Sequence, residues 1–346
     1  MLYITYMRPS LLRLAEAQPS LVQDYLVSQE IPQEISRWKY FDSRFNRGRQ
    51  RGFVCMKDDK VCGFLGLIPF QARKDGRTLE CAWSCDWSVD ASQVAGGMGI
   101  MMVKQAKDAY DAVFNVGGNE NTRRIFPRLS DRTVWDAGIS FVLPLRLGAI
   151  LTKLAPPFLR PLTQRKFLRD FPLKWMRGAG LDNRVQVDPG VSPEIAPLLE
   201  DAGGEWRPLY DYEYVRWQLE TCPAVRSWSC YIPAQPTPRA AAIVWRSATS
   251  TDFWRLAVWG IRDAKDEAIL LIRQAIQFVH RENGAALFAI ASHLDQDLIT
   301  ALTAEGFFPR RARLPFYGMR GREAKLTFDE FQVMSLLDAD LPYRFS

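Results

Sequence analysis

The sequence predicts an α/β protein, more closely an α+β one, with two similar lobes in which a mixed, mainly antiparallel sheet is flanked by helices. The first observation is length, because 346 residues exceed the size at which one hydrophobic core keeps growing. The second is that the hydrophobic period alternates between that of strands and that of helices. The third is that the order of these elements repeats after about 180 residues, which indicates an internal duplication.

The first half begins with a helix and a run of strands. Apolar residues at helical spacing predict a helix over 19–29, and the aromatic-rich segment 34–41 is expected to pack a helix onto a sheet. Segments 53–56 and 61–68 read as strands joined by the polar turn 57–60, and Pro69 should limit the second of them. A third strand is expected over 78–89.

The stretch 81–121 is the centre of the predicted first lobe. A strand enters a turn that contains Gly96, Gly97 and Gly99, and an apolar-periodic helix leaves that turn. The first N–H groups of a helix have no partner inside the helix, so such a turn can hold a phosphate. A second strand, 112–116, then ends at a polar segment that includes Asn119 and Asn121.

The second half repeats this order with a different turn. The aromatic anchor at 214–217 echoes 35–38, and the strand 253–259 stands where 81–87 stood. Where the first half has its glycine turn, the second has the acidic segment 263–267, so we expect no phosphate binding there. The remaining elements are strands at 228–232, 240–245 and 286–291 and helices at 268–279 and 295–304.

Bulk composition favours an ordinary globular protein. Hydrophobic residues make up 47% of the chain and charged residues 24%, which excludes a disordered chain. Six cysteines lie at 55, 62, 81, 85, 222 and 230 without zinc-site spacing, so we expect reduced, mostly buried thiols and no metal. No secretory signal and no apolar run of roughly 20 residues is visible, which predicts a soluble, cytoplasmic protein.

A basic, proline-containing connector joins the two predicted lobes. Segment 146–184 holds nine basic and two acidic residues and alternates leucines with Arg and Lys. One interpretation is a solvated linker whose leucines pack on the second lobe, and another is peripheral contact with an anionic membrane, at the inner face. No recognised nucleic-acid-binding pattern accompanies the charge. We expect lobes at 1–140 and 205–346 with the connector at 141–204.

The order of strands, the Gly-x-Gly turn, the helix, and the strand that ends before Asn119 resemble the GNAT acyltransferase superfamily. Two such units, over roughly 34–135 and 205–320, are similar to the tandem arrangement of Fem-type aminoacyltransferases and of proteins from polysaccharide gene clusters. This resemblance implies an acyl-CoA substrate, acetyl-CoA or another, and an amine acceptor on a sugar, a peptide or a small molecule. It also implies a role in envelope or polysaccharide biosynthesis.

The resemblance implies an acyl-CoA site in the first lobe. The CoA pyrophosphate would lie on backbone N–H groups of the glycine turn, and the thioester beside the two asparagines. The residues assigned to this site are Val89, Gly96, Gly97, Met98, Gly99, Asn119 and Asn121. Val94 stands where the family has an arginine or glutamine three residues before Gly97.

Two carboxylates on the strand 78–89 are the candidates for a catalytic base. Asp86 lies between Trp83 and Trp87, which would raise its pKa if the group is buried, and Glu80 is the second candidate. Asp86 could equally cap a turn or pair with an arginine. For the acid, the family often has a tyrosine seven residues after the asparagine that follows the strand, and this chain has Phe126 there.

Two functions therefore remain open from the sequence. The first is an acyl-CoA-dependent N-acyltransferase. The second is a duplicated module that has lost transfer chemistry and serves in binding or assembly. The two histidines, His280 and His293, lie apart, and the chain has neither a serine-hydrolase elbow nor a nucleotide-binding loop of the Gly-x-x-x-x-Gly-Lys type.

Overall fold

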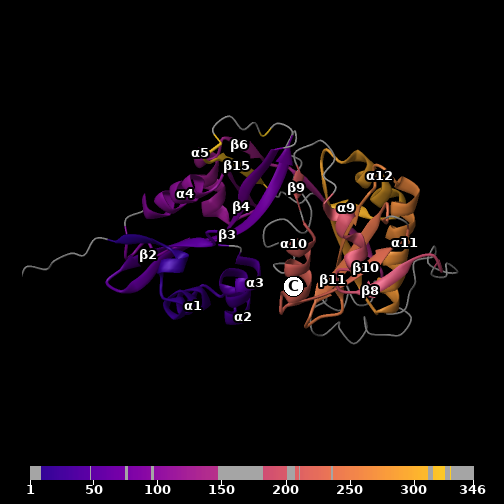
Figure 1. The fold of residues 1–346 in the computed structure, drawn as a ribbon, viewed down its shortest axis with the longest axis horizontal. Coiled ribbons are helices and arrows are strands. Elements are labelled where there is room, and N and C mark those ends of the chain that lie inside the picture. The colour runs from indigo at the N-terminus through magenta and orange to yellow at the C-terminus, as the bar shows by residue number, and fades with distance from the viewer. Residues whose placement is uncertain are drawn as a thin grey trace, which may run out of the picture. The chain divides into compact units, whose positions relative to one another are not determined.

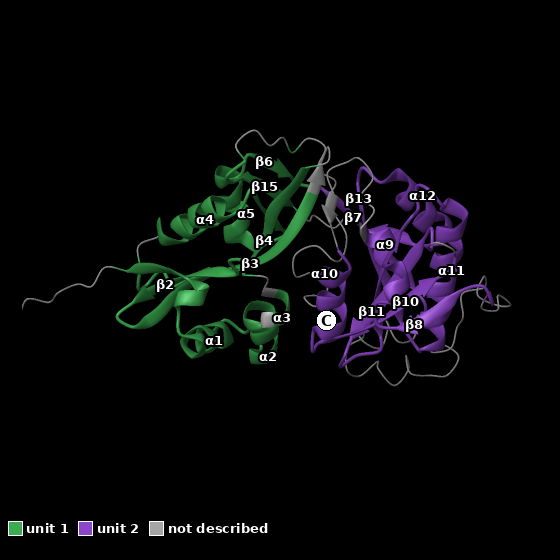
Figure 2. Cartoon of the chain, in the orientation of Figure 1, with its two compact units in different colours: residues 1–135, 204–209, 314–331 green, residues 136–203, 210–313, 332–346 purple. Residues whose placement is uncertain are grey.

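The computed structural model in Figure 1 describes residues 9–46, 48–74, 77–94, 97–146, 182–200, 207–209, 211–234, 237–310, 315–323 and 328. The chain forms two compact units, coloured separately in Figure 2. The first comprises residues 1–135, 204–209 and 314–331, and the second 136–203, 210–313 and 332–346. Each unit therefore contains segments from both halves of the chain.

The first unit is built on an eight-stranded sheet in which seven strands follow the order β1-β2-β3-β4-β5-β15-β6 and β9 pairs with β3. Among the strands that the structure describes here, only β4 and β5 pair in parallel, so the sheet is mixed and mainly antiparallel, as predicted. The strands are β1 (Ser10–Arg13), β2 (Gly52–Lys57), β3 (Lys60–Lys74), β4 (Arg77–Val89), β5 (Ala112–Val116), β6 (Arg132–Val134), β9 (Arg207–Leu209) and β15 (Phe316–Arg320).

Helices of the first unit confirm the predicted order. A 3-10 turn spans Leu14–Glu16, and the helices are α1 (Pro19–Ser28), α2 (Gln33–Ser36), α3 (Ser43–Asn46), α4 (Gly97–Ala109) and α5 (Glu120–Leu129). A π-helical turn, Arg37–Phe41, follows α2 directly. Met98, Met102 and Val103 of α4 pack into the core that lies on one face of this sheet.

Pro69 does not end its strand, contrary to expectation. β3 runs on to Lys74, and Pro69 pairs with Ala82 of β4. On the other side of β3, pairing with β2 ends at Gly66 and pairing with β9 begins at Gln71. Pro69 therefore faces a stretch without a neighbouring strand, where a missing N–H removes no ladder hydrogen bond.

Within its described residues, the second unit has a seven-stranded sheet in the order β14-β7-β13-β12-β11-β10-β8, in which only β12 and β13 pair in parallel. The strands are β7 (Gly138–Pro144), β8 (Gln186–Pro189), β10 (Val225–Tyr231), β11 (Ala241–Ser247), β12 (Phe253–Trp259), β13 (Ala286–Ser292) and β14 (Phe308–Arg310). The helices are α9 (Ala196–Glu200), α10 (Tyr212–Arg216), α11 (Lys265–Arg281) and α12 (Gln296–Ala304), with a 3-10 turn at Pro193–Ile195 and a π-helical turn at Trp217–Thr221.

The two sheets exchange one strand each. β15, from the end of the second half, lies between β5 and β6 in the first sheet, and β7, from the end of the first half, lies between β13 and β14 in the second. The exchange supports the duplication, because each sheet takes the strand from the other half of the chain at the same position, beside β5 in the first sheet and beside β13 in the second. The lobe boundaries expected near residues 140 and 205 stay a prediction.

Most of the basic connector lies outside the described residues. Of its nine basic residues, the structure describes Arg146, which donates to the His280 carbonyl, and Arg184, which pairs with Asp182. Membrane contact through 146–184 therefore stays a prediction. Among the helices of the described ranges, none combines the length and the apolar character needed to cross a membrane. All six cysteines are buried and none forms a disulfide, which confirms that they are buried thiols.

Candidate functional site

The parallel strands β4 and β5 separate halfway along their length. They pair from Cys81 with Ala112 to Trp83 with Phe114, although β4 continues to Val89 and β5 to Val116. At the point of separation, hydrogen bonds from side chains take the place of the backbone hydrogen bonds between the two strands. The Asn115 amide donates to the Ser84 carbonyl at 2.9 Å, and the Ser84 hydroxyl donates to the Phe114 carbonyl at 3.1 Å.

Tyr317 lies beside this separation on the exchanged strand β15. It pairs in register with Asn115 and is fully buried. Its ring centroid is 5.5 Å from that of Phe126, and the Phe126 centroid is 5.2 Å from that of Trp87. Burial is the main cause that raises the pKa of the Tyr317 hydroxyl, and the nearby Arg123 opposes it.

Three enclosed polar atoms at this place have no hydrogen-bond partner among the described residues. They are Asn115 Oδ1, Trp87 Nε1 and the Tyr317 hydroxyl oxygen. An enclosed polar group without a partner costs about 1–3 kcal/mol, so each needs an explanation. A bound substrate with donors and acceptors of its own would supply one.

A β-bulge follows on β4. Phe64 pairs with Ser88 and Gly66 with Cys85, so Asp86 and Trp87 together oppose the single residue Leu65. Asp86 has a φ of +49°, an uncommon value for a residue other than glycine. Bulges interrupt the ladder and often lie next to active sites, where they redirect a side chain.

Asp86 is held by a buried cation and a buried phenol from one π-helical turn. The Lys39 ammonium lies 2.5 Å from its carboxylate, and the Tyr40 hydroxyl donates to the same oxygen at 2.5 Å. The Lys39 side chain is completely buried and that of Asp86 is 4% exposed. Gly66 leaves room for this arrangement, because a Cβ there would overlap the Tyr40 hydroxyl.

The glycine turn starts α4, as predicted, but its members differ in role. A Cβ at Gly97 would meet nothing within 4 Å, so the helix start is open at that residue. A Cβ at Gly99 would lie 2.8 Å from the Trp87 indole, so Gly99 makes room for that ring. Met98 and Val94 are core residues, and Val89 packs against the same core. Gly96, also assigned to this site, lies outside the described residues.

The two asparagines after β5 lie at the start of α5. Asn119 is the N-cap, and its side chain accepts from the Thr122 N–H at 3.0 Å. Asn121 lies in the first turn, and both residues are exposed. Capping by Asn is a sufficient structural reason for Asn119.

Glu80 lies six residues before Asp86, in the part of β4 that pairs with β3 ahead of the bulge. Its carboxylate pairs with Arg49 at 2.8 Å and accepts from Gln71 at 2.9 Å. Six residues of extended strand span about 20 Å. The structure therefore does not bring the two candidate bases together.

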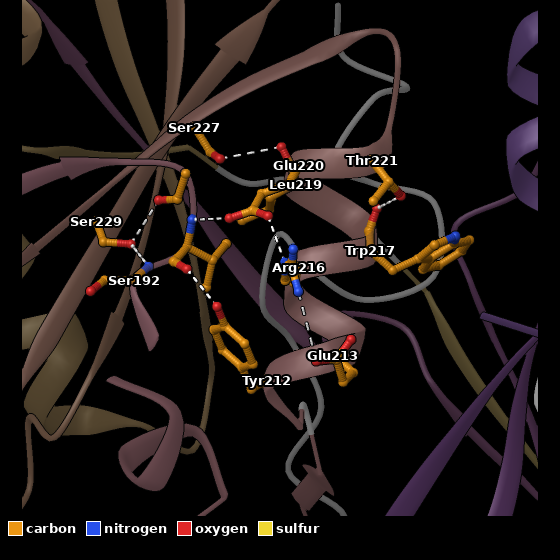
Figure 3. Close-up of polar contacts among 12 residues, drawn as sticks. Ser192, Tyr212, Glu213, Arg216, Trp217, Leu219, Glu220, Thr221, Ser227 and Ser229 are labelled. Atoms are coloured by element: carbon orange, nitrogen blue, oxygen red, sulfur yellow. Dashed lines mark hydrogen bonds and ion pairs between the residues drawn. The ribbon is translucent and has the colours of Figure 1, made fainter. Parts of the chain in front are cut away.

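The second unit uses its π-helical turn differently (Figure 3). Glu220 accepts from the Val191 N–H at 2.7 Å and pairs with Arg216, and the Ser227 hydroxyl donates to the Leu219 carbonyl. Tyr212 on α10 donates to the Val191 carbonyl. These contacts hold the segment after β8 against the π-helical turn, so the residues of this turn stabilise the fold of the second unit.

Sequence reasoning missed Ser84, Asn115, Tyr317, Lys39 and Tyr40. A polar residue inside the apolar strand 112–116 was a usable signal for Asn115. No local signal could have found Tyr317, because a strand exchange from about 200 residues away brings it to β5.

Comparisons with protein-family models and with curated proteins find no match. Solved structures do match. A GCN5-related N-acetyltransferase from Anabaena variabilis is similar at a TM-score of 0.56 and 12% identity, over 89% of this chain and 72% of that one. N-Myristoyltransferase from Saccharomyces cerevisiae, solved with bound myristoyl-CoA, is similar at 0.56 and 10% identity, over 97% and 85%.

A third solved structure, a tandem GNAT protein from the clavulanic acid biosynthesis pathway, is similar to this chain over nearly its whole length. It is similar at a TM-score of 0.52 and 12% identity, over 90% of this chain and 98% of that one. The chain has a tandem GNAT fold. At these identities the similarity defines the fold of both units, and the chemistry of the first unit has to be argued from its own residues.

Proposed function

We propose that the chain transfers an acyl group from acyl-CoA to an amine, with the first unit as the acyl-CoA site. One observation carries this proposal: in the first unit, an open glycine helix start follows a strand that separates from its parallel neighbour. The first supplies backbone donors for a pyrophosphate, and the second supplies unpaired polar atoms for the rest of the substrate.

The N–H groups of the first turn of α4, at Gly97, Met98 and Gly99, would hold the pyrophosphate. Val89, Gly96, Asn119 and Asn121 belong to the same proposed site. That the neighbouring fold of N-myristoyltransferase was solved with bound myristoyl-CoA supports acyl-CoA as the substrate class.

In the reaction, the amine nitrogen bonds to the thioester carbon, the C–S bond breaks, the amine loses a proton and the thiolate gains one. Asp86 is proposed as the base or as the group that orients the amine, with Lys39 and Tyr40 fixing its carboxylate. Glu80 remains the second candidate for the base. Tyr317 is proposed as the source of the proton for the thiolate, since Phe126 has no proton to donate.

The acceptor is an amine on a sugar, a peptide or a small molecule. A role in envelope or polysaccharide biosynthesis, and contact of 146–184 with an anionic membrane, extend this proposal and rest on the sequence alone. Co-sedimentation with anionic liposomes at low salt tests the membrane contact, and a protein that stays in the supernatant refutes it.

Calorimetric titration with acetyl-CoA and with CoA tests the acyl-CoA site. The wild-type chain should bind both, and Gly97→Glu should weaken binding by about 100-fold or more, because a carboxylate would face the pyrophosphate. Lys265→Glu, at the first residue of α11 in the second unit, is the matched control and should bind as the wild type does. No binding by the wild type, in calorimetry and in thermal shift, refutes the site.

Catalysis needs a separate variant. Asp86→Asn should retain acetyl-CoA binding and lose release of the free thiol of CoA in the presence of amine acceptors. Asn is compatible with the positive φ at this position, so the bulge should persist, and retained acetyl-CoA binding shows that the variant is folded although the buried Lys39 loses its counter-ion. Turnover equal to that of the wild type would remove Asp86 from the mechanism.

A further inference from the structure

A buried arginine in the second unit has no acidic partner in the part of the chain that the structure describes. Arg255 lies in the middle of β12 and pairs in register with Trp245 on one side and Phe288 on the other. It is 3% exposed. Its strand neighbours Trp254 and Leu256 belong to the core beneath α11, so the alternation of a strand places Arg255 on the opposite face of the sheet.

No described residue forms a hydrogen bond, an ion pair or a ring contact with the Arg255 side chain. Burial lowers the pKa of its guanidinium to about 10, and no charged group among the described residues contributes to that shift. The other buried cations of the described residues, Lys39 and Arg51, do have partners. Lys39 pairs with Asp86, and Arg51 donates to the Lys39 carbonyl.

The guanidinium is nevertheless reachable. Its nitrogens are not among the fully enclosed side-chain atoms without a partner, so part of the small surface that Arg255 retains lies at its charged end. A buried cation without a counter-ion is destabilising, and burial of charges is normally compensated by a partner. A ligand can be that partner.

We infer that Arg255 binds the carboxylate of a small molecule in the second unit. A planar guanidinium accommodates a carboxylate through two parallel N–H···O bonds. A single positive charge with no second cation close to it among the described residues matches a monoanion better than a phosphate dianion, and an exposure of 3% admits only a slender group. This site goes beyond acyl transfer, because it lies in the unit from which we expect no CoA binding.

Thermal unfolding of the full chain with sodium acetate, against sodium chloride at equal ionic strength, tests the inference. The wild type should gain about 2 °C or more in melting temperature, saturably, as acetate rises into the range of its dissociation constant. Arg255→Met should melt higher than the wild type without acetate and lose the acetate-specific gain. Arg273→Met, which removes an exposed arginine paired with Glu305, should keep the gain.

Three outcomes overturn the inference. They are no acetate-specific gain in the wild type, an equal gain in Arg255→Met, and a larger gain with inorganic phosphate than with acetate. Arg255→Lys covers the case in which the methionine variant fails to fold. Lysine keeps the positive charge but lacks the paired N–H donors of a guanidinium, so its acetate-specific gain in melting temperature should be smaller than that of the wild type. None of these measurements depends on acyl-CoA, so failure here leaves the proposed transfer untouched.

Discussion

The two units place different residues where their parallel strands meet the exchanged strand. Both parallel ladders start in the same way, with Cys81 opposite Ala112 in the first unit and Phe253 opposite Ala286 in the second. Three residues further along, the first unit has Ser84 beside Asn115, and its ladder has already ended there.

The equivalent pair of the second unit is Leu256 opposite Ala289, which continues its ladder. The exchanged strands follow the same rule, since Tyr317 lies opposite Asn115 and Phe141 lies opposite Ala289. Leu256, Ala289 and Phe141 are all part of the apolar core of the second unit. At this place the first unit therefore has buried polar side chains, and the second has an apolar core.

The π-helical turns show the same contrast. Aligning Trp217 with Trp38 places Gln218 where the first unit has Lys39, and aligning the central strands places Val258 where it has Asp86. The pairing of β11 with β12 continues without a bulge from Arg246 to Ala241. The ion pair, the bulge and the positive φ are therefore features of the first unit, where they surround the proposed base Asp86.

Tyr317→Phe should produce the largest loss of turnover. Unchanged turnover would show that the polar residues of the first unit do not distinguish it chemically from the second. Loss of a proton donor costs about 10²–10⁴-fold in turnover. Release of the CoA thiol from acetyl-CoA in the presence of an amine acceptor measures it. Acetyl-CoA binding should be unchanged, because only the hydroxyl is removed.

Two further variants separate a chemical role from a structural one. Adding Phe126→Tyr to Tyr317→Phe should restore part of the turnover, because it places a hydroxyl on the ring that packs against residue 317. Tyr110→Phe, which removes the hydroxyl of another buried tyrosine in the same core, should leave turnover as it is. Equal losses in the Tyr317 and Tyr110 variants would point to packing alone.

Lys39→Gln gives the first unit the residue of the second and should destabilise it by about 3–5 kcal/mol, because the Asp86 carboxylate then loses its buried counter-ion. Urea unfolding measures the loss. Lys39→Gln combined with Asp86→Asn should recover most of it, as in a double-mutant cycle of coupled groups. Additive losses would show that the two residues do not depend on each other.

Local periodicity predicted most of the elements and little of the site. The strands 112–116 and 253–259 and the helices after 97 and 265 follow from apolar spacing, which acts within one element. The strand exchange depends on pairings between residues about 200 positions apart, for which no local pattern exists. The partners of Asp86 were missed for the same reason, because Lys39 lies on a separate turn 47 residues away.

Gly190→Ala should destabilise the second unit by about 1–2 kcal/mol, since its φ is +81° and a Cβ would lie 2.6 Å from Glu220 Oε1. That contact would disturb the bond from Val191 to Glu220 that fastens the turn (Figure 3). Gly97→Ala in the first unit should change stability by less than about 0.5 kcal/mol, because its Cβ would meet nothing. Urea unfolding compares the two, and equal effects would contradict the open helix start.

The smallest expected effect is a pH dependence of stability between pH 7 and pH 5 that comes from the second unit. Both histidines of the chain lie in its second half, and burial, aided by Arg146, lowers the pKa of His280. Because the folded pKa lies below the unfolded value near 6.5, the neutral ring contributes its full stability above that value. The contribution is lost as pH falls through the folded pKa, with a slope of at most about 1.4 kcal/mol per pH unit.

His280→Gln should flatten this slope between pH 7 and pH 5 in urea unfolding, whereas His293→Gln should keep it. A slope that survives in His280→Gln would place the titrating group elsewhere.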